Sequence, residues 1–599
     1  MDSRQLIDRR HLDFLLHEVL EVDDLCRYAR FAEHGRETFA AALDLAQQIA
    51  LDKFLPHNRK ADLQEPQLVD GKVELIPEIG EAVAAFCAAG FPAVLADYDR
   101  GGMQMPFVVG AACDALFCSA NAGTIAYPTL ARAAANLLDV YATDEQKRLY
   151  MQPILEGRYF GTMCLSEPQA GSSLADLKTA ATPRADGSYA IAGAKMWISA
   201  GDHELGENIV HLVLARIQGA PAGVRGISLF IVPRWRVEAD GRRGERNDVR
   251  LAGLNHKMGQ RASVNTFLKF GEQGDCVGYL VGAPHNGLAQ MFHMMNEERI
   301  GVGLSAIQQA AASYQYALAY ARERHQGRHP DQKDAASPAV ALIEHADVRR
   351  MLLLQKCYVE GGQMLAFDAA LLVDRQYDAD ESVREQSHLL LELLTPIVKA
   401  WNSDYALRAN DLAIQVFGGY GYTRDYPVEQ CWRDNRINPI HEGTNGIQAL
   451  DLLGRKALMR DGAALRLLLE RIAQTCALAA TDTALASFAT DLQRAAGLVG
   501  ATTQAAGRRM AAGEVRAVLA NASHYLQLLG HVVVAWGWLR MAMAAQRALA
   551  AGTAERDFYD GKLQACRAFF AIELPQVELA ARLLADSDRS AYDMRDAWF

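Results

Sequence analysis

The sequence predicts an α+β protein of several domains: an N-terminal α-helical domain, a middle β domain, a C-terminal helical bundle and an additional helical domain. Its 599 residues, with 50% hydrophobic content, exceed what a single core usually contains. The hydrophobic pattern also changes along the chain, from helical spacing to short β-type runs and back. We expect an N-terminal extension followed by four domains, with limits at 1–35, 36–156, 157–280, 281–460 and 465–599.

The first change of pattern separates helical from β-type sequence. Before it, Thr143 stands ahead of the acidic residues 144–145 and an apolar helical run, which is typical of a helix start. From about residue 157 the chain has short β-type runs divided by Gly, Pro and Asp, at 189–193, 209–214 and 226–233. A compact β domain follows from this pattern.

Helical patterns return after residues 286–287 and continue to about residue 460, with one glycine-rich break at 418–421. The remaining part is rich in Ala and Leu at helical spacing. Its most apolar stretch, 531–551, is interrupted by two arginines and a glutamine, so it falls short of the ~20 apolar residues that a membrane span needs. We expect a buried helix there and no membrane span.

Composition excludes several classes of function. The formal net charge of −11 argues against unaided binding to nucleic acid or to an anionic membrane. The ten cysteines show neither a CxxC pair nor a zinc-type Cys/His spacing, so we expect reduced thiols and no metal site. Residues 1–10 carry charges where a secretory signal would be apolar, which favours a cytoplasmic protein.

Candidate chemistry begins with the segment 163–173, MCLSEPQAGSS. Pro168 and Gly171 would bend the backbone and leave amides free, while Ser166 and Ser172 offer short hydroxyls that can reach a polar ligand. A plain turn between strands would use the same residue types.

A second candidate is the segment 195–201, KMWISAG. Strand alternation places Trp197 and Ser199 on one face. An ordinary strand would bury Trp197 in a core.

The third segment, 441–448, reads HEGTNGIQ and sets the carboxylate of Glu442 beside Gly443, just ahead of a helical apolar pattern. Read alone, it is a loop that enters a helix, with Thr444 or Asn445 as the N-cap and Glu442 near the positive end of the helix.

Together these three segments resemble the acyl-CoA dehydrogenase family, over roughly residues 35–460. The family has the same domain order, and the resemblance implies a β-barrel-like middle domain. The sequence GDH at 201–203 and the additional C-terminal domain resemble a bacterial subfamily of about 600-residue chains. That subfamily includes FadE-type and 3-methylmercaptopropionyl-CoA dehydrogenases. The resemblance implies FAD as cofactor and conversion of an acyl-CoA thioester to the trans-2-enoyl-CoA.

By this resemblance, Glu442 is the base that removes the α-proton, and flavin N5 takes the β-hydride. An apolar acyl chain and a flavin closing over the carboxylate would raise its pKa toward the working pH. The amide of Glu442 and a ribityl hydroxyl of FAD would meet the developing oxyanion. Arg299 matches the family arginine near the CoA end, although a charged surface helix is its alternative. The predicted substrate contacts are Ser172, Arg299, Glu442 and Gly443.

The resemblance also implies a set of FAD contacts. Arg324 and Gln326, with the loop 418–421, match family segments that reach the cofactor of the neighbouring subunit. We expect a homodimer, because the domain 465–599 should occupy surface that smaller relatives use for tetramer contacts. A solvated helix end is the alternative for the arginines of this region. The complete predicted set is Met163, Leu165, Ser166, Gly171, Ser172, Trp197, Ser199, Arg324, Gln326, Gln415, Gly418, Gly419 and Thr444.

Three functions remain open at this point. A dehydrogenase would pass its electrons to an electron-transfer flavoprotein, whereas an acyl-CoA oxidase would pass them to oxygen. A DNA-associated flavoprotein of the same fold is the third possibility. It would need a basic C-terminal surface, but residues 465–599 hold 14 Lys+Arg against 13 Asp+Glu. We therefore expect no nucleic-acid partner, and the acyl chain of the substrate is not identified by the sequence.

Overall fold

The computed structural model describes residues 8–332, 334 and 336–599, except for the side chains of residues 293–296. Residues 1–7, which hold most of the N-terminal stretch behind the expectation about export, lie outside the described residues. The chain divides into two compact units. One unit is Glu37–Glu298, and the other combines the described part of 1–36 with Arg299–Phe599.

The first unit begins with helices. Its longest, α5 (Phe107–Tyr141), leaves helical geometry at Asn121 and contains Pro128. At Thr143 the side chain accepts a hydrogen bond from the amide of Gln146, whose own side chain accepts from the Thr143 amide, so the predicted helix start is a capping box. The other helices of this region are α2 (Arg36–Ile49), α3 (Asn58–Leu63), α4 (Pro77–Ala88), α6 (Asp144–Gln146) and α7 (Gln152–Leu155), and a small hairpin is formed by β1 (Gln67–Val69) and β2 (Lys72–Glu74).

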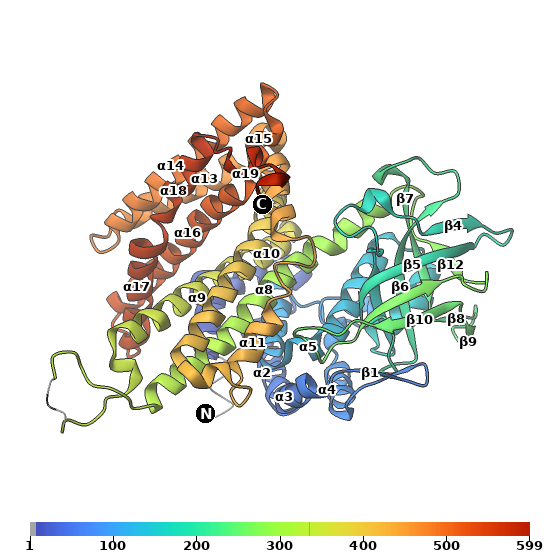
Figure 1. Ribbon diagram of the computed structural model, residues 1–599, viewed down its shortest axis with the longest axis horizontal. Coiled ribbons are helices and arrows are strands. Elements are labelled where there is room, and N and C mark those ends of the chain that lie inside the picture. The colour runs from blue at the N-terminus through green and yellow to red at the C-terminus, as the bar shows by residue number, and fades with distance from the viewer. Residues whose placement is uncertain (1–7, 333, 335) are drawn as a thin grey trace. The chain divides into compact units, whose positions relative to one another are not determined.

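The rest of the unit is a β domain, as predicted (Figure 1). Its main sheet has the order β10-β11-β5-β12-β7-β6-β3, and β4 pairs with both β5 and β6. The strands β5, β12, β7, β6 and β4 therefore form a closed ring, which confirms a barrel-like domain. The strands are β3 (Tyr159–Cys164), β4 (Ala180–Pro183), β5 (Tyr189–Ser199), β6 (Asn208–Ile217), β7 (Ile227–Pro233), β8 (Trp235–Val237), β9 (Arg243–Arg246), β10 (Val249–Leu254), β11 (Asn265–Phe270) and β12 (Val277–Leu280).

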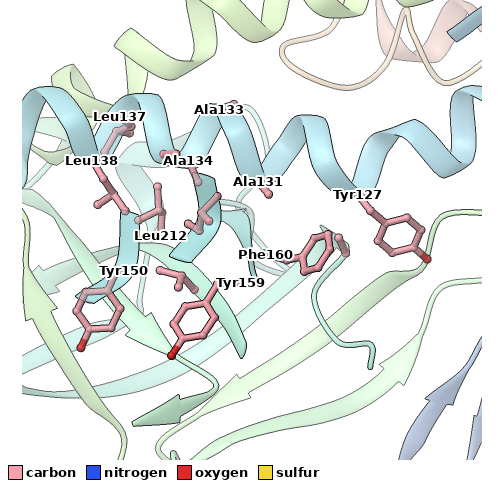
Figure 2. Close-up of a cluster of buried hydrophobic side chains, with 14 of the residues drawn as sticks. Tyr127, Ala131, Ala133, Ala134, Leu137, Leu138, Tyr150, Tyr159, Phe160 and Leu212 are labelled. Carbon is pink, nitrogen blue, oxygen red and sulfur yellow. The ribbon is translucent and has the colours of Figure 1, made fainter. Parts of the chain in front are cut away.

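One apolar cluster joins α5 to the strands of this unit. Figure 2 shows that α5 presents small and aromatic side chains to residues that follow it in the chain, among them Phe160 and Leu212. Tyr127 has no exposed surface, and its hydroxyl donates to the Ala262 carbonyl and accepts from the Val264 amide. A buried tyrosine needs such partners for its hydroxyl, and here they fix β-domain backbone against the helix.

The second unit is helical. Three long helices, α8 (Gly287–Glu323), α9 (Ala346–Asp374) and α10 (Glu381–Phe417), form a bundle, although α8 begins within the first unit. Two short helices, α11 (Val428–Asn435) and α12 (Asn445–Asp451), follow. The remaining helices are α1 (Arg9–Asp13), α13 (Met459–Ala479), α14 (Ala486–Ala511), α15 (Val515–Leu519), α16 (Ala522–Ala550), α17 (Arg556–Ala568), α18 (Gln576–Ala585) and α19 (Ser590–Asp593), joined by short 3-10 and π-helical turns.

The apolar stretch near residues 531–551 lies in α16, which is buried among α13, α14, α17 and α18 (Figure 1). Of the described helices, α5 and α16 are long and apolar enough to cross a membrane. However, 78% and 89% of their most apolar segments are buried inside the fold, as in core helices of globular proteins. The prediction of a buried helix is confirmed.

The short helix α1 packs on the additional C-terminal helices. Arg10 pairs with Glu555 at 3.0 Å. Next to it lies a buried charged cluster, in which the Lys562 ammonium is 2.8 Å from Nδ1 of His11 and 2.9 Å from a carboxylate oxygen of Glu360. Burial lowers the pKa of Lys562 to about 8 against the opposing pull of Glu360.

Candidate functional site

The proposed catalytic loop, residues 441–444, joins the turn after α11 to α12. Glu442 and Gly443 both have left-handed backbones, with φ of 52° and 81°. A Cβ added to Gly443 would lie 2.7 Å from Nε2 of Gln448, so this position has both a conformational and a steric reason to be glycine. Thr444 is the N-cap of α12, and its hydroxyl accepts from the Ile447 amide at 3.3 Å.

Two side chains hold the backbone of this loop. Nζ of Lys399, from the middle of α10, donates to the Gly443 carbonyl at 2.8 Å. Nε2 of Gln448 donates to the Glu442 carbonyl at 3.1 Å. In the described part of the chain, no acceptor takes the amide of Glu442 or Gly443. Those amides are therefore available to a ligand.

The carboxylate of Glu442 is half-buried. Burial raises its pKa above the ordinary value, and the positive charges of Arg299 and Lys399 oppose that rise. A raised pKa is the direction expected from the sequence, although here the protein alone provides the burial. Arg299 itself is buried on α8, and burial lowers its pKa against the opposing pull of Asp451 and Glu442.

A second group of predicted residues lies in the β domain, where the segment after β3 turns back on itself. Glu167 and Ala170 bond each other through their backbones. The buried carboxylate of Glu167 accepts from Nζ of Lys195 at 3.0 Å and from the Thr179 hydroxyl at 2.6 Å. Lys195 also donates to the Leu165 carbonyl at 2.9 Å. This ion pair therefore holds the segment that carries Ser166, whereas Gly171 and Ser172 remain exposed.

Trp197 and Ser199 lie on the neighbouring strand β5, and the amide of Met196 donates to the Ser166 carbonyl at 3.0 Å. A bulge opposite Phe267 changes the alternation, so both Lys195 and Ile198 are buried. Trp197 has a left-handed backbone with φ of 66°, and its side chain is 63% exposed. A strained backbone and a large exposed aromatic side chain are typical of a ligand-binding surface. An ordinary core strand would instead bury the aromatic ring.

The remaining predicted cofactor residues gather at one end of the bundle. Tyr320, one turn before Arg324, stacks on Phe417 with ring centroids 4.2 Å apart. This contact brings the segment with Arg324 and Gln326 near the Gln415–Gly419 region, where α10 ends. The Gln326 amide donates to the Val340 carbonyl at 2.9 Å, so a backbone hydrogen bond fixes the position of Gln326.

Sequence reasoning did not assign a role to the residues that hold the two loops, Lys399, Gln448, Glu167 and Lys195. One signal was available for Lys399, because a lysine stands inside the apolar run TPIVKAW. A charged residue in a buried stripe of a helix indicates either a polar partner or a functional site.

Comparison with known proteins gives a consistent result. The family model of the acyl-CoA dehydrogenase middle domain matches residues 162–270, that of the acyl-CoA dehydrogenase C-terminal domain matches 285–458, and an acetyl-CoA dehydrogenase C-terminal-like model matches 468–595. The 3-methylmercaptopropionyl-CoA dehydrogenase of Ruegeria pomeroyi is 36% identical, over 92% of this chain and 93% of the relative. The chain belongs to the acyl-CoA dehydrogenase family. It is therefore an oxidoreductase that acts on acyl-CoA thioesters.

Other relatives agree with this assignment. The broad-specificity linear acyl-CoA dehydrogenase FadE5 of Mycobacterium tuberculosis is 34% identical over 98% of both chains. A solved structure of an acyl-CoA dehydrogenase complexed with FAD from Bacillus anthracis has a TM-score of 0.75, with 18% identity, and covers 94% of this chain and 90% of that one. At that identity the likeness supports the fold, and it includes most of the additional C-terminal region.

Proposed function

We propose that the enzyme oxidises an acyl-CoA thioester at its α and β carbons with FAD as cofactor, and that Glu442 is the base. The observation that carries the proposal is the conformation of the loop 441–444. It places a carboxylate of raised pKa next to two amides that make no bond to a described residue. A base and a pair of oxyanion donors are the groups that removal of a proton beside a thioester carbonyl requires.

The chain's own residues divide this work. A carboxylate oxygen of Glu442 takes the α-proton, and the raised pKa of this carboxylate brings it closer to the working pH. The Glu442 amide donates to the thioester oxygen as negative charge develops there. Arg299 supports the ionised form of Glu442 before the proton is transferred, and its cationic side chain favours the CoA end of a substrate.

The residues of the β domain fit FAD by their chemistry. Trp197 offers an exposed aromatic face, and a Cβ added to Gly171 would meet nothing within 4 Å, so a ligand can approach its backbone closely. Met163, Leu165, Ser166, Ser172, Trp197 and Ser199 would hold the cofactor from this domain, while Thr444 belongs to the catalytic loop. When bound, FAD supplies the acceptor for the β-hydride.

Substrate and partners extend the proposal. Ser172, Arg299 and Gly443 would contact the acyl-CoA, in addition to Glu442. The two curated relatives are named for a sulfur-containing and a linear acyl chain, which leaves the acyl group open. We further propose a cytoplasmic homodimer that passes electrons to an electron-transfer flavoprotein. The exposed Arg324, Gln326, Gln415, Gly418 and Gly419 would serve the partner's cofactor.

We also propose the domain limits 36–156, 157–280, 281–460 and 465–599. The last limit is supported by a break in α13, where Arg460, Asp461 and Gly462 have left-handed backbones before the helix continues. In limited proteolysis of the folded enzyme, we expect the first cuts at or near these limits, and the masses of the fragments identify them.

Replacing Glu442 tests the central proposal. In Glu442→Gln we expect an intact fold that still binds FAD and acyl-CoA. Flavin reduction should be slower by about 10³-fold or more, because an amide cannot accept the proton. Single-turnover bleaching of the flavin by saturating acyl-CoA measures this rate. Glu429→Gln is the control, since it removes a carboxylate that pairs with Arg433 within α11.

Reduction of the Glu442 variant within about tenfold of wild type would contradict the assignment, because that is only ~1.4 kcal/mol in the barrier. A protein that folds but takes up no FAD would contradict the cofactor proposal. Rapid reoxidation of the reduced enzyme by air would favour an acyl-CoA oxidase over a dehydrogenase.

A further inference from the structure

Lys399 is an ammonium group buried in the middle of a helical bundle. Its side chain has no exposed surface, and its neighbours on α10, Val398 and Ala400, are also fully buried. Removing an ammonium group from water costs roughly several kcal/mol, so a lysine at this position needs polar contacts that offset the cost. The described contacts of Nζ are the Gly443 carbonyl at 2.8 Å and Oδ1 of Asn445 at 2.9 Å. Both acceptors belong to the catalytic loop or to the residue that follows it.

Asn445 extends this contact into a network with α10. Its Nδ2 donates to Oδ1 of Asp404 at 2.7 Å and to the Ala400 carbonyl at 3.3 Å. Its Oδ1 also accepts from the Ser403 hydroxyl at 3.2 Å. Ser403 and Asp404 follow Lys399 by four and five residues, so all three lie on the side of α10 that holds the start of α12 by side-chain hydrogen bonds.

The catalytic loop needs such an anchor because its backbone is unfavourable. A non-glycine residue in the left-handed region costs roughly 1–2 kcal/mol, and Glu442 is such a residue. Gln448 holds the Glu442 carbonyl at 3.1 Å. The next carbonyl, that of Gly443, is held mainly by Lys399 at 2.8 Å, and Gln448 reaches it at 3.4 Å. Without the second anchor, the strained pair of residues can relax and turn both the carboxylate and the amide away from their present directions.

Charge adds a second effect. The charged groups that face Glu442 are Arg299 from α8 and Lys399 from α10. Those that face Lys399 are Asp404 on its own helix, Glu442 on the loop and Arg299 on α8. Burial lowers the pKa of Lys399 to about 8, so it is mainly protonated near neutral pH and favours the ionised form of Glu442.

We propose that Lys399 is a positioning residue for the reaction: through the Gly443 carbonyl and Asn445 it holds Glu442 in its reactive direction. This inference rests on the proposed function of Glu442. It adds a specific prediction that the base proposal does not make, because Lys399 is buried behind the loop and acts through it.

The test compares Lys399→Met with a matched control, Lys562→Met. Both lysines are fully buried in the same unit, but Lys562 contacts His11 and Glu360 instead of the catalytic loop. In FAD-loaded Lys399→Met we expect the limiting rate of flavin reduction to fall at least about tenfold, with acyl-CoA affinity changed by less than about threefold. In Lys562→Met the rate should stay within about twofold of wild type.

The pH profile separates positioning from a general loss of stability. Reduction requires ionised Glu442, so its rate rises with pH along an acid limb. Loss of the Lys399 charge raises the pKa of Glu442, and we expect that limb to move to higher pH by on the order of 1 unit. Lys399→Arg keeps the charge, so its limb should stay near that of wild type even though the altered geometry slows reduction.

A Lys399→Met enzyme with a wild-type limiting rate and an unmoved acid limb would overturn the proposal. If that variant does not retain FAD, Asn445→Ala decides, because it removes the second acceptor of Lys399 and the link to Asp404 while the lysine remains. A wild-type limiting rate of flavin reduction in Asn445→Ala would then reject the positioning role. Glu442→Gln is measured in parallel: normal reduction by that variant rejects the base itself, whereas its inactivity beside a normal Lys399 variant rejects this inference alone.

Discussion

The two loops that carry the candidate chemistry are each held by a buried lysine, but the lysines have different partners. In the β domain, Lys195 bonds the Leu165 carbonyl and the carboxylate of Glu167. In the bundle, Lys399 bonds the Gly443 carbonyl and the neutral side chain of Asn445. Each lysine fixes one backbone carbonyl of its loop. The Lys195 ammonium pairs directly with a carboxylate, whereas the Lys399 ammonium bonds neutral oxygens and acts on the carboxylates of Asp404 and Glu442 through space.

The two glutamates show the consequence of this difference. At Glu167, burial acts to raise the pKa, but Lys195, the Thr179 hydroxyl and the Lys178 amide together lower it to about 2. At Glu442, burial prevails over Arg299 and Lys399, so the pKa is raised. A carboxylate with many hydrogen-bond donors supports structure because it stays ionised, whereas one with few donors is suited to accept a proton. The same type of anchor thus serves the proposed cofactor loop and the proposed catalytic loop.

The largest effect on stability is expected for Lys195→Met, which leaves the buried carboxylate of Glu167 without its cation. Breaking a buried pair from one side typically costs ~3–5 kcal/mol. Hydrogen exchange of the β5 amides should show this loss of opening free energy. Lys269→Met is the control, since Lys269 pairs with Glu272 on the surface of the same sheet. A loss at Lys195 no larger than that control would mean that the ion pair does not hold the loop.

The next largest effect is the response of stability to acid, which should differ between the two glutamates. The folded-state pKa of Glu167 is depressed to about 2, so its contribution is complete above its ordinary value near 4.5 and is lost as pH falls toward 2. The loss amounts to about 3 kcal/mol when this shift is converted to free energy. Glu442 has a raised pKa, so its protonation on acidification favours the folded state. Thermal unfolding between pH 5 and 2.5 should therefore become less pH-dependent in Glu167→Gln, while Glu442→Gln should not reduce that dependence.

The smallest effect on stability is expected when one glycine of each loop is replaced by alanine. Gly443 has φ of 81° and a Cβ there would meet Gln448, so Gly443→Ala should cost about 1–3 kcal/mol and slow flavin reduction. A Cβ on Gly171 would meet open space, so Gly171→Ala should change stability by less than about 0.5 kcal/mol. Denaturation and FAD titration of both variants measure this difference. Equal destabilisation by the two substitutions would show that the catalytic loop is not strained as described.

Much of the fold could be predicted from periodicity and local chemistry. The runs 189–193 and 209–214 lie within strands β5 and β6, and the run 226–233 begins one residue before β7 and ends with it. Thr143 caps a helix through the residue three positions later. Thr444 likewise caps α12, one of the two alternatives that the sequence left open. These features depend on contacts within a few residues, which a linear pattern records directly.

The sequence by itself determined the family and the chemical groups, because the motifs around Ser166, Trp197 and Glu442 keep their residue types in short segments. Tertiary structure decided how those groups are held. Lys399 reaches Gly443 across 44 positions and Lys195 reaches Leu165 across 30, and nothing in the local pattern links these residues. The bulge that leaves Trp197 exposed depends on pairing with β11. Burial, which raises the pKa of Glu442, is likewise a property of packed neighbours, so it exists only when distant parts of the chain come together.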